Sequence, residues 1–191
     1  MIQAIETRYK GYRFRSRLEA RWAVFFDALG IKWEYEIEGF YLNSGKYLPD
    51  FKLPFVYDRQ RKQGVWVEIK GAEPTREENA RCEGLCHSTG TSVILLVGPP
   101  PIDPWHSDGD CGYQWTYSRY EGEPVAMWDN CMALHYCTSC RSGEAAKFEV
   151  KNDYYSCPKC GGDECTYDNK FTRDAAERAR RHEIEHALKL L

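Results

Sequence analysis

Two short stretches of this chain carry charged residues inside runs that otherwise have the pattern of β-strands. The first reads YLPDFKLP and includes Asp50, and the second reads VWVEIK and includes Glu68 and Lys70. Successive side chains of a strand point to opposite faces of the sheet, so Glu68 and Lys70 share one face. If the two runs pair, Asp50 and Glu68 converge. Two carboxylates beside an ammonium group form a hard oxygen-ligand site for Mg²⁺, with a cation left over to orient water or hold a phosphate.

The elements around these stretches must position the three side chains. We expect a helix over residues 16–29, because apolar residues recur there at helical spacing and a glycine follows. We expect a second helix over residues 74–88, an alternating strand over 33–40 and a buried mid-sheet strand over 91–97. Together with the two central runs, the order is helix, three strands, helix, strand, which predicts a mixed α/β (α+β) fold.

Glu19 has two interpretations. Ser16 and Glu19 form the S-x-x-E pattern of a capping box, which satisfies N–H groups at the start of a helix. Alternatively, Glu19 lies on the flank of the apolar stripe and faces the sheet edge where a metal would bind. Glu36, in the alternating strand, is a further candidate for that metal, although its simplest place is in solvent. The residues alone leave both questions open.

The charge of the chain is unevenly distributed. The 191 residues are 42% hydrophobic, enough for a core, and the net charge of -3 argues against indiscriminate binding of polyanions. Residues 1–32, however, hold seven basic and three acidic residues, a local charge of +4. Within them the segment GYRFRSR interleaves aromatic residues with Arg13, Arg15 and Arg17. This pattern is typical of an arm that contacts phosphates, although a solvated helix start explains it equally well.

Four of the nine cysteines have the spacing of a structural zinc site. An odd count without an apolar N-terminal leader disfavours a secreted disulfide framework and favours a reducing cytoplasm. Four thiolates close the tetrahedron around Zn²⁺ and leave no open position for catalysis. The two Cys-x2-Cys pairs, the second followed by Gly161-Gly162, are Cys137, Cys140, Cys157 and Cys160. Cys165 is an alternative ligand in another register, whereas Cys82 and Cys86 are expected to fill the core.

The C-terminal segment, residues 172–191, has the apolar stripe of a helix and contains HEIEH at positions 182–186. This matches the zinc-protease pattern H-E-x-x-H. We reject that interpretation, because His182 and His186 lie roughly opposite Ile184 on a helical wheel and so face outward.

The segments RSRLEARWAVFFDALGIKWEYEIEGF, YLPDF and VWVEIKG resemble the restriction-endonuclease-like nuclease superfamily, whose signature is PD-(D/E)xK. They are most similar to phage and prophage nucleases of this layout, over about residues 9–97. The resemblance implies an αβββαβ core. It assigns the Asp of the PD motif to Asp50, the E-x-K pair to Glu68 and Lys70, and the glutamate of the first helix to Glu19.

The resemblance further implies a Mg²⁺- or Mn²⁺-dependent DNA endonuclease that hydrolyses phosphodiester bonds, with branched or replicating phage DNA as one candidate substrate. Asp50 and Glu68, with the Ile69 carbonyl, would hold the metal, and Lys70 would orient or activate the attacking water. Glu19 would bind a second metal or its water ligand. The residues expected to contact DNA are Arg13, Arg15 and Arg17. The alternative is a catalytically inactive adaptor that binds DNA or protein through the zinc ribbon.

We therefore expect four segments: a nuclease core over residues 1–98, an irregular linker or cover over 99–132, a four-cysteine zinc ribbon over 133–168 and a C-terminal helix over 169–191. No stretch approaches the roughly 20 apolar residues of a membrane span. The expected location is the cytoplasm of a bacterial host, with the gene carried by a phage or prophage. A homodimer, a phage protein partner and the DNA preference stay open.

Overall fold

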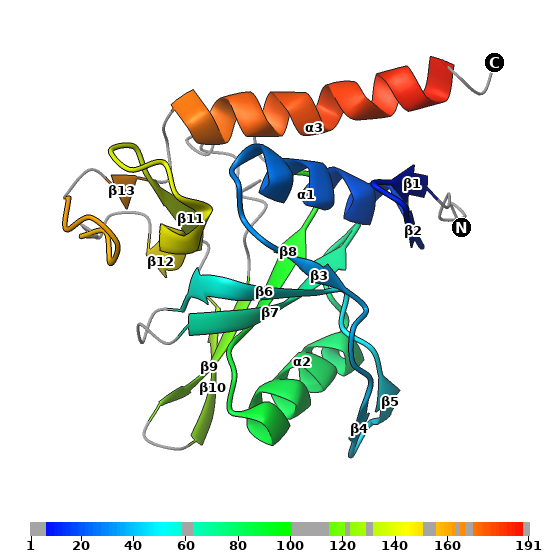
Figure 1. The fold of residues 1–191 in the computed structure, drawn as a ribbon. Coiled ribbons are helices and arrows are strands. Elements are labelled where there is room, and N and C mark those ends of the chain that lie inside the picture. The colour runs from blue at the N-terminus through cyan, green and yellow to red at the C-terminus, as the bar shows by residue number, and fades with distance from the viewer. Residues whose placement is uncertain are drawn as a thin grey trace.

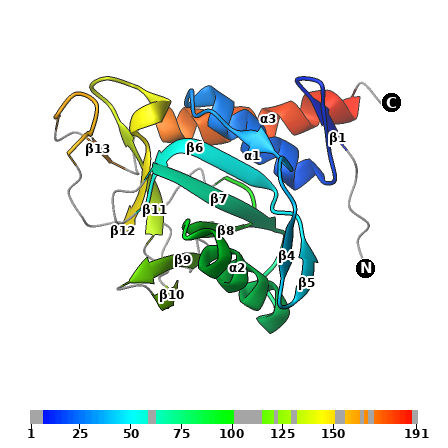
Figure 2. The same cartoon turned by 60° about the horizontal axis from the view of Figure 1, so that its bottom comes forward.

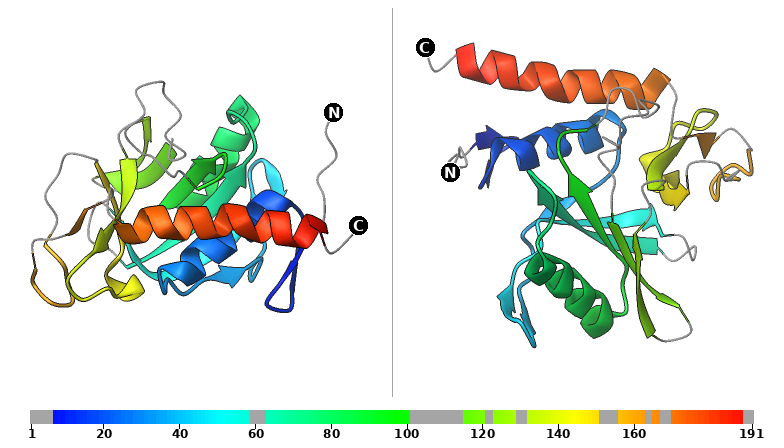
Figure 3. Two further views of the ribbon diagram at one scale, coloured as in Figure 1. Left: turned by 90° about the horizontal axis from the view of Figure 1, so that it is seen from above. Right: turned by 180° about the vertical axis from the view of Figure 1, so that it is seen from behind.

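The computed structural model describes residues 7–58, 63–100, 115–120, 123–128, 132–150, 156–162, 165–166 and 170–188. Within these ranges the helices and the main sheet form layers (Figure 1). Helix α3 (Lys170–Leu188) lies over α1 (Arg17–Ala28), α1 covers one face of the sheet, and α2 (Arg76–Thr89) covers the other. The same order of layers is seen from behind (Figure 3). The expectation of a mixed α/β fold is confirmed.

The strands fall into three groups along the chain. Short strands precede and follow α1 in the N-terminal half of the chain, namely β1 (Thr7–Tyr9), β2 (Tyr12–Phe14), β3 (Glu34–Tyr35), β4 (Phe40–Leu42) and β5 (Gly45–Tyr47). The central strands are β6 (Phe51–Tyr57), β7 (Gln63–Lys70) and β8 (Val93–Val97). The C-terminal half adds β9 (Trp115–Tyr120), β10 (Glu123–Trp128), β11 (Met132–Cys137), the 3-10 helix η1 (Gly143–Ala145), β12 (Lys147–Val150) and β13 (Cys165–Thr166).

The main sheet has the strand order β10-β9-β8-β7-β6-β12-β11-β13, and β3 also pairs with β6. Strands β6 and β7 are antiparallel, whereas β7 and β8 are parallel and are connected through α2. Strand β8 therefore lies in mid-sheet, as its continuous apolar run predicted. The helices predicted over residues 16–29 and 74–88 are confirmed, with their observed ends shifted by no more than a turn.

Two apolar cores, one on each side of the sheet, follow from the alternation of β7. Val65, Val67 and Ile69 belong to the core that contains the aromatic residues of α1. Trp66 belongs to the second core, together with Leu85 of α2. The predicted period of two is therefore correct, and it sends Glu68 and Lys70 toward the α2 side of the sheet.

The strand predicted over residues 33–40 is wrong beyond Tyr35. Only Glu34 and Tyr35 pair with β6. Glu36 has a φ of 47°, in the left-handed region, and its N–H donates to the carbonyl of Asp50 at 2.9 Å. This conformation turns the chain out of the ladder, so Phe40 begins a separate β4–β5 hairpin instead of ending the same strand.

The C-terminal half continues the sheet on both sides. Strand β9 pairs with β8, and β10 pairs with β9. The KFEV segment, which lies between the two cysteine pairs, forms β12. This strand pairs with β11 and meets β6 where Lys147 lies beside Tyr57. Figure 2 shows β11 and β12 next to the end of β6. Backbone hydrogen bonds thus join the cysteine-bearing segment to the central strands.

Helix α3 confirms the predicted C-terminal helix within residues 170–188. It packs on α1 through small side chains, and Ala175, Ala176 and Ala179 are buried in the α1 core. The side chains of the HEIEH segment lie outside the described residues. No helix in the described part of the chain combines the length and apolar character needed to cross a membrane.

Gly143 generates the first prediction, because a side chain there would collide with the main chain of the α1 terminus. A Cβ at this position would lie 2.1 Å from the carbonyl oxygen of Gly30 and 2.5 Å from the amide nitrogen of Ile31. We expect Gly143→Ala to lower the free energy of unfolding by about 1–3 kcal/mol, as overpacking does in cores. Urea denaturation measures this, with Gly71→Ala as control, since a Cβ at Gly71 meets nothing within 4 Å. Equal midpoints for the two variants would contradict the tight docking of η1.

A candidate carboxylate site and a four-cysteine metal centre

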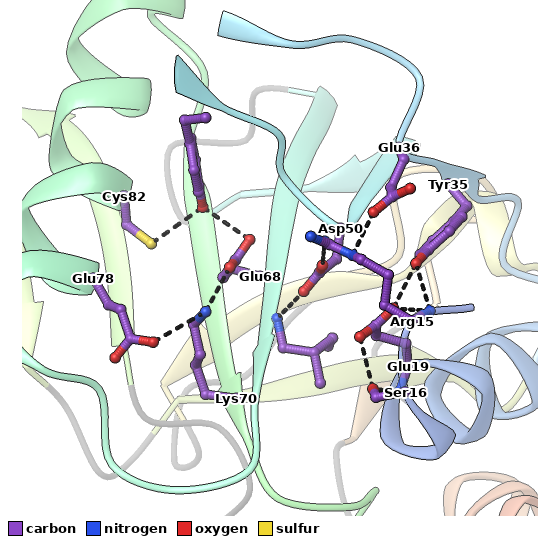
Figure 4. Close-up of polar contacts among 12 residues, drawn as sticks. Arg15, Ser16, Glu19, Tyr35, Glu36, Asp50, Glu68, Lys70, Glu78 and Cys82 are labelled. Atoms are coloured by element: carbon purple, nitrogen blue, oxygen red, sulfur yellow. Dashed lines mark hydrogen bonds and ion pairs between the residues drawn. The ribbon is translucent and has the colours of Figure 1, made fainter. Parts of the chain in front are cut away.

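Three buried carboxylates gather where α1, β6 and β7 meet (Figure 4). Asp50 precedes β6 and Glu68 lies in β7, with relative exposures of 3% and 5%. Phe51 pairs with Val67, so Asp50 and Glu68 are the next positions along the two strands. Glu19 of α1 is also buried, at 7% exposure. The structure therefore brings together the acidic residues that the sequence singled out.

Glu19 is both part of the helix cap and part of the acidic cluster. Its N–H donates to Ser16 Oγ at 3.2 Å, and the Ser16 hydroxyl donates back to Glu19 Oε1 at 2.6 Å. The other carboxylate oxygen, Oε2, accepts a hydrogen bond from the Tyr35 hydroxyl at 2.5 Å. Burial and this contact with Glu19 raise the pKa of Tyr35, so it remains a donor. The two interpretations of Glu19 do not exclude each other.

Arg15 enters the cluster and binds two carboxylates. Its Nη2 lies 2.6 Å from Asp50 Oδ1, and its Nε lies 2.5 Å from Glu36 Oε1. The second oxygen of Asp50 accepts the backbone N–H of Ile69 at 2.7 Å. Both Asp50 oxygens are therefore occupied by protein donors. Glu36, which the sequence left open, joins the cluster through Arg15.

Charge repulsion is strong at Asp50. Burial raises the pKa of Asp50 well above its ordinary value, and the neighbouring Glu68 and Glu19 raise it further. The Ile69 N–H and the Arg15 guanidinium lower it but only in part. Burial lowers the pKa of Arg15, whereas Asp50, a hydrogen bond with Tyr35, and Glu36 raise it, so the net pKa of Arg15 is raised. The raised pKa of Asp50 therefore favours its protonated form, and Arg15 offsets only part of the cost of its charged form.

A second network occupies the α2 side of the same strands. Glu68 accepts a hydrogen bond from the Tyr47 hydroxyl at 2.8 Å on Oε2, and its Oε1 lies 2.8 Å from Lys70 Nζ. Lys70 Nζ also lies 3.2 Å from Glu78 Oε1. Burial lowers the pKa of Lys70, but Glu68 and Glu78 more than offset this, so its pKa is raised. Lys70 is therefore a charged donor.

The sequence did not assign Tyr47 or Glu78 to this site. Glu78 belongs to a capping box with Thr75 at the start of α2, which the T-x-x-E spacing could have revealed. Its contact with Lys70 depends on how α2 returns over the sheet. Tyr47 also lies 3.7 Å from the Cys82 sulfur. Burial raises the pKa of the Cys82 thiol to about 12, so it stays protonated.

The oxygen atoms of the carboxylate cluster suit a divalent cation in their chemistry but not in their present arrangement. Carboxylate oxygens and a backbone carbonyl are the ligands that Mg²⁺ and Mn²⁺ prefer, so the chemistry fits. Within the described residues, however, the oxygens of Asp50, Glu68 and Glu19 are not all within 4.8 Å of one another. Arg15 is paired with Asp50, and Lys70 is paired with Glu68.

The arginines that the sequence associated with phosphates separate in the structure. Arg15 points into the carboxylate cluster, as Figure 4 shows. Arg13, on β2, and Arg17, at the start of α1, are exposed. The exposed Arg13 and Arg17 flank Arg15 in the sequence, and of the three arginines Arg15 is the one with an ion pair to Asp50.

The four predicted zinc ligands lie together. The sulfur atoms of Cys137, Cys140, Cys157 and Cys160 are all within 4.8 Å of one another, the only such group of potential metal ligands in the described part of the chain. The closest sulfur pairs are Cys137 with Cys160 at 3.7 Å and Cys140 with Cys157 at 3.6 Å. Four such sulfurs can hold a metal ion, and thiolate sets of this kind suit zinc.

Each of the two cysteine pairs is followed by a turn, and the two turns have the same geometry. Arg141 donates its N–H to the Cys137 carbonyl at 3.1 Å, and Gly161 donates to the Cys157 carbonyl at 2.9 Å. Both residues have positive φ, 52° and 72°. The sequence signalled only the glycine. Cys82 and Cys86 are buried, as expected, and the backbone of Cys165 pairs with that of Cys137, while Cys111, Cys131 and the Cys165 side chain lie outside the described residues.

Comparisons with protein family models, curated proteins and solved structures gave no match. The functional assignment therefore depends on the chain's own residues.

The four-cysteine centre generates the second prediction. We expect one zinc per chain, and we expect Cys157→Ser to release it, because three thiolates bind zinc much more weakly than four. Asp50→Ala should keep the full zinc content, since Asp50 belongs to the other cluster. Elemental analysis of the purified proteins measures the stoichiometry. Wild-type protein without zinc, or equal zinc in wild type and Cys157→Ser, would contradict the assignment.

Proposed function

We propose that the protein is a divalent-metal-dependent DNA endonuclease with a restriction-endonuclease-like core, in which Asp50 and Glu68 bind Mg²⁺ or Mn²⁺. The observation that carries the proposal is the burial of Asp50, Glu68 and Glu19 at one junction of the fold. Burying charged groups costs several kcal/mol of stability per ion unless they are paired. A cluster of buried carboxylates is therefore expected to have a use, and binding a cation is the simplest one.

The topology supports the proposed core. Helix α1 is followed by β3, by the separate β4–β5 hairpin and by β6 and β7, and then by α2 and β8; β3 and β7 both pair with β6. Apart from the inserted hairpin, this order agrees with the αβββαβ core that the resemblance implies. Asp50 directly precedes β6, Glu68 lies in β7 and Glu19 lies in the first helix, positions that support the roles proposed for them.

The side chains have distinct roles in the proposed reaction. Asp50 and Glu68, with the Ile69 carbonyl, would hold the cation, which supplies Lewis acidity at the scissile phosphate. Glu19 is held by Tyr35 and Ser16 and extends the same negative site toward α1. Water adds to phosphorus as the P–O bond to the leaving oxygen breaks.

Lys70 acts as a donor in this proposal. A group with a raised pKa keeps its proton at neutral pH, so Lys70 is suited to orient water and to offset negative charge on the phosphate. Glu78 positions Lys70 for this role. The Lys70 ammonium group contacts both Glu68 and Glu78, which keeps it near the carboxylates.

The four-cysteine segment is proposed as a structural zinc ribbon that grips DNA or a partner protein. An inactive adaptor built on the ribbon is the alternative, and it leaves the buried carboxylates without a role. Arg13 and Arg17 are the proposed DNA contacts on the core. A phage- or prophage-encoded nuclease of the bacterial cytoplasm is consistent with this combination.

DNA cleavage assays provide the third prediction. We expect metal-dependent cleavage of at least one member of a panel of linear duplex, single-stranded and four-way-junction DNA, with Mg²⁺ or Mn²⁺ and not with EDTA. Lys70→Ala should reduce the rate about 100-fold or more, the usual effect of removing a transition-state donor. Lys46→Ala is the matched control. Lys46 is exposed on β5, so we expect this variant to cleave DNA at the wild-type rate.

Two results would contradict the proposed function. One is a complete panel without metal-dependent cleavage, which would favour the adaptor. The other is cleavage by Lys70→Ala at the wild-type rate, which would attribute the activity to a contaminant or to another site.

A further inference from the structure

Arg15 occupies the position at Asp50 that a cation would need. Its Nη2 lies 2.6 Å from Asp50 Oδ1, while Asp50 Oδ2 is bound by the Ile69 N–H. Oδ1 is thus the Asp50 oxygen that can change partner without disturbing the backbone. A divalent cation and the Arg15 guanidinium would compete for this one atom, because two positive groups on the same oxygen repel each other.

Arg15 is also placed so that it can leave. The residue lies between the end of β2 and the start of α1, and its side chain is 55% exposed. Its two carboxylate partners differ in exposure, since Asp50 is at 4% and Glu36 at 23% on their side chains. Turning the guanidinium outward would move a side chain that is already more than half exposed, and Glu36 could then meet water.

Lys70 differs from Arg15 in this respect. Lys70 is held by Glu68 and by Glu78 of α2, with a side-chain exposure of 25%. It has no contact with Asp50 among the described ion pairs. Departure of Arg15 would release Asp50 and Glu36, whereas departure of Lys70 would release Glu68 and Glu78. The two protein cations differ in exposure, 55% against 25%, and Arg15 is the more readily exchanged.

A phosphate is the ligand that would draw Arg15 away. The planar guanidinium matches phosphate oxygens in a bidentate manner, and the exposed Arg13 and Arg17 flank Arg15 in sequence. A nucleic-acid backbone reaching this arm would compete with Asp50 and Glu36 for the Arg15 donors. The arm and the carboxylate cluster are therefore linked through a single side chain.

We propose that Arg15 is a substrate-responsive counter-ion, which neutralises Asp50 and Glu36 in the free protein and moves to a DNA phosphate on substrate binding, so that Asp50 can accept a divalent cation. This inference rests on the proposed nuclease function. Its consequence is reciprocal: DNA strengthens cation binding and the cation strengthens DNA binding by the same factor. The free protein holds its site closed to divalent cations until a phosphodiester backbone is present.

The first arm of the test measures Mn²⁺ binding to the zinc-loaded protein without DNA, by electron paramagnetic resonance of free Mn²⁺. We expect Arg15→Gln to bind Mn²⁺ about ten-fold or more tightly than wild type, because removing a contacting charge releases Asp50. Arg15→Lys keeps the positive charge but loses the planar, two-pronged guanidinium, so we expect a smaller gain in Mn²⁺ affinity. It serves as the second variant if Arg15→Gln is too unstable to measure. Arg8→Gln, an equal charge change at an exposed position, should match wild type. Adding Asp50→Asn to either Arg15 variant should abolish the gain.

The second arm measures binding of a duplex to the same zinc-loaded protein with no Mg²⁺ or Mn²⁺ added, so that the proposed cleavage does not occur. We expect Arg15→Gln to bind DNA about ten-fold more weakly than wild type, since a phosphate contact is lost. Opposite effects on Mn²⁺ and DNA are the signature of an exchanged counter-ion. Unchanged or weaker Mn²⁺ binding by both Arg15 variants would overturn the proposal, as would unchanged DNA binding. Failure of the nuclease function would appear separately, as absence of cleavage by a protein whose Arg15 variants still gain Mn²⁺.

Discussion

The burial of carboxylates at the junction of α1, β6 and β7 is the constraint on which the rest of the structure depends. Asp50 and Glu68 are almost fully removed from solvent, and Glu19 lies beside them. Such groups are tolerated only where donors and cations surround them. Arg15, Tyr35, Tyr47 and Lys70 supply these donors and cations.

The short peripheral strands supply these partners. Strand β2 delivers Arg15, β3 delivers Tyr35 and the turn at Glu36, and β5 delivers Tyr47. Helix α2 adds Glu78 from the other side of the sheet. The apolar cores on the two faces of the sheet hold these elements in place, and the side chains of the site are thereby held in fixed positions. Gly143 and the pairing of β12 with β6 join the four-cysteine segment to the same framework.

Residues whose role depends on local pattern could be predicted from the sequence. The alternation of VWVEIK placed Glu68 and Lys70 on one face, and the Cys-x2-Cys spacing identified all four sulfurs of the metal centre. Residues whose role depends on a tertiary contact could not. Glu36 leaves its strand because its N–H bonds to the Asp50 carbonyl, and Arg141 adopts a positive φ without the glycine that usually marks such a turn. Arg15 was expected at a phosphate because nothing in GYRFRSR indicates that Asp50 lies within its reach.

Anomalous scattering from crystals grown with Mn²⁺ and a short DNA duplex is the most direct test of whether Asp50 and Glu68 form a cation site. We expect a Mn²⁺ peak at a distance of about 2.2 Å from an oxygen of each carboxylate, with Arg15 no longer on Asp50. Crystals that contain DNA but show no peak at the carboxylates, with Arg15 still paired to Asp50, would contradict a cation site at the centre of this fold.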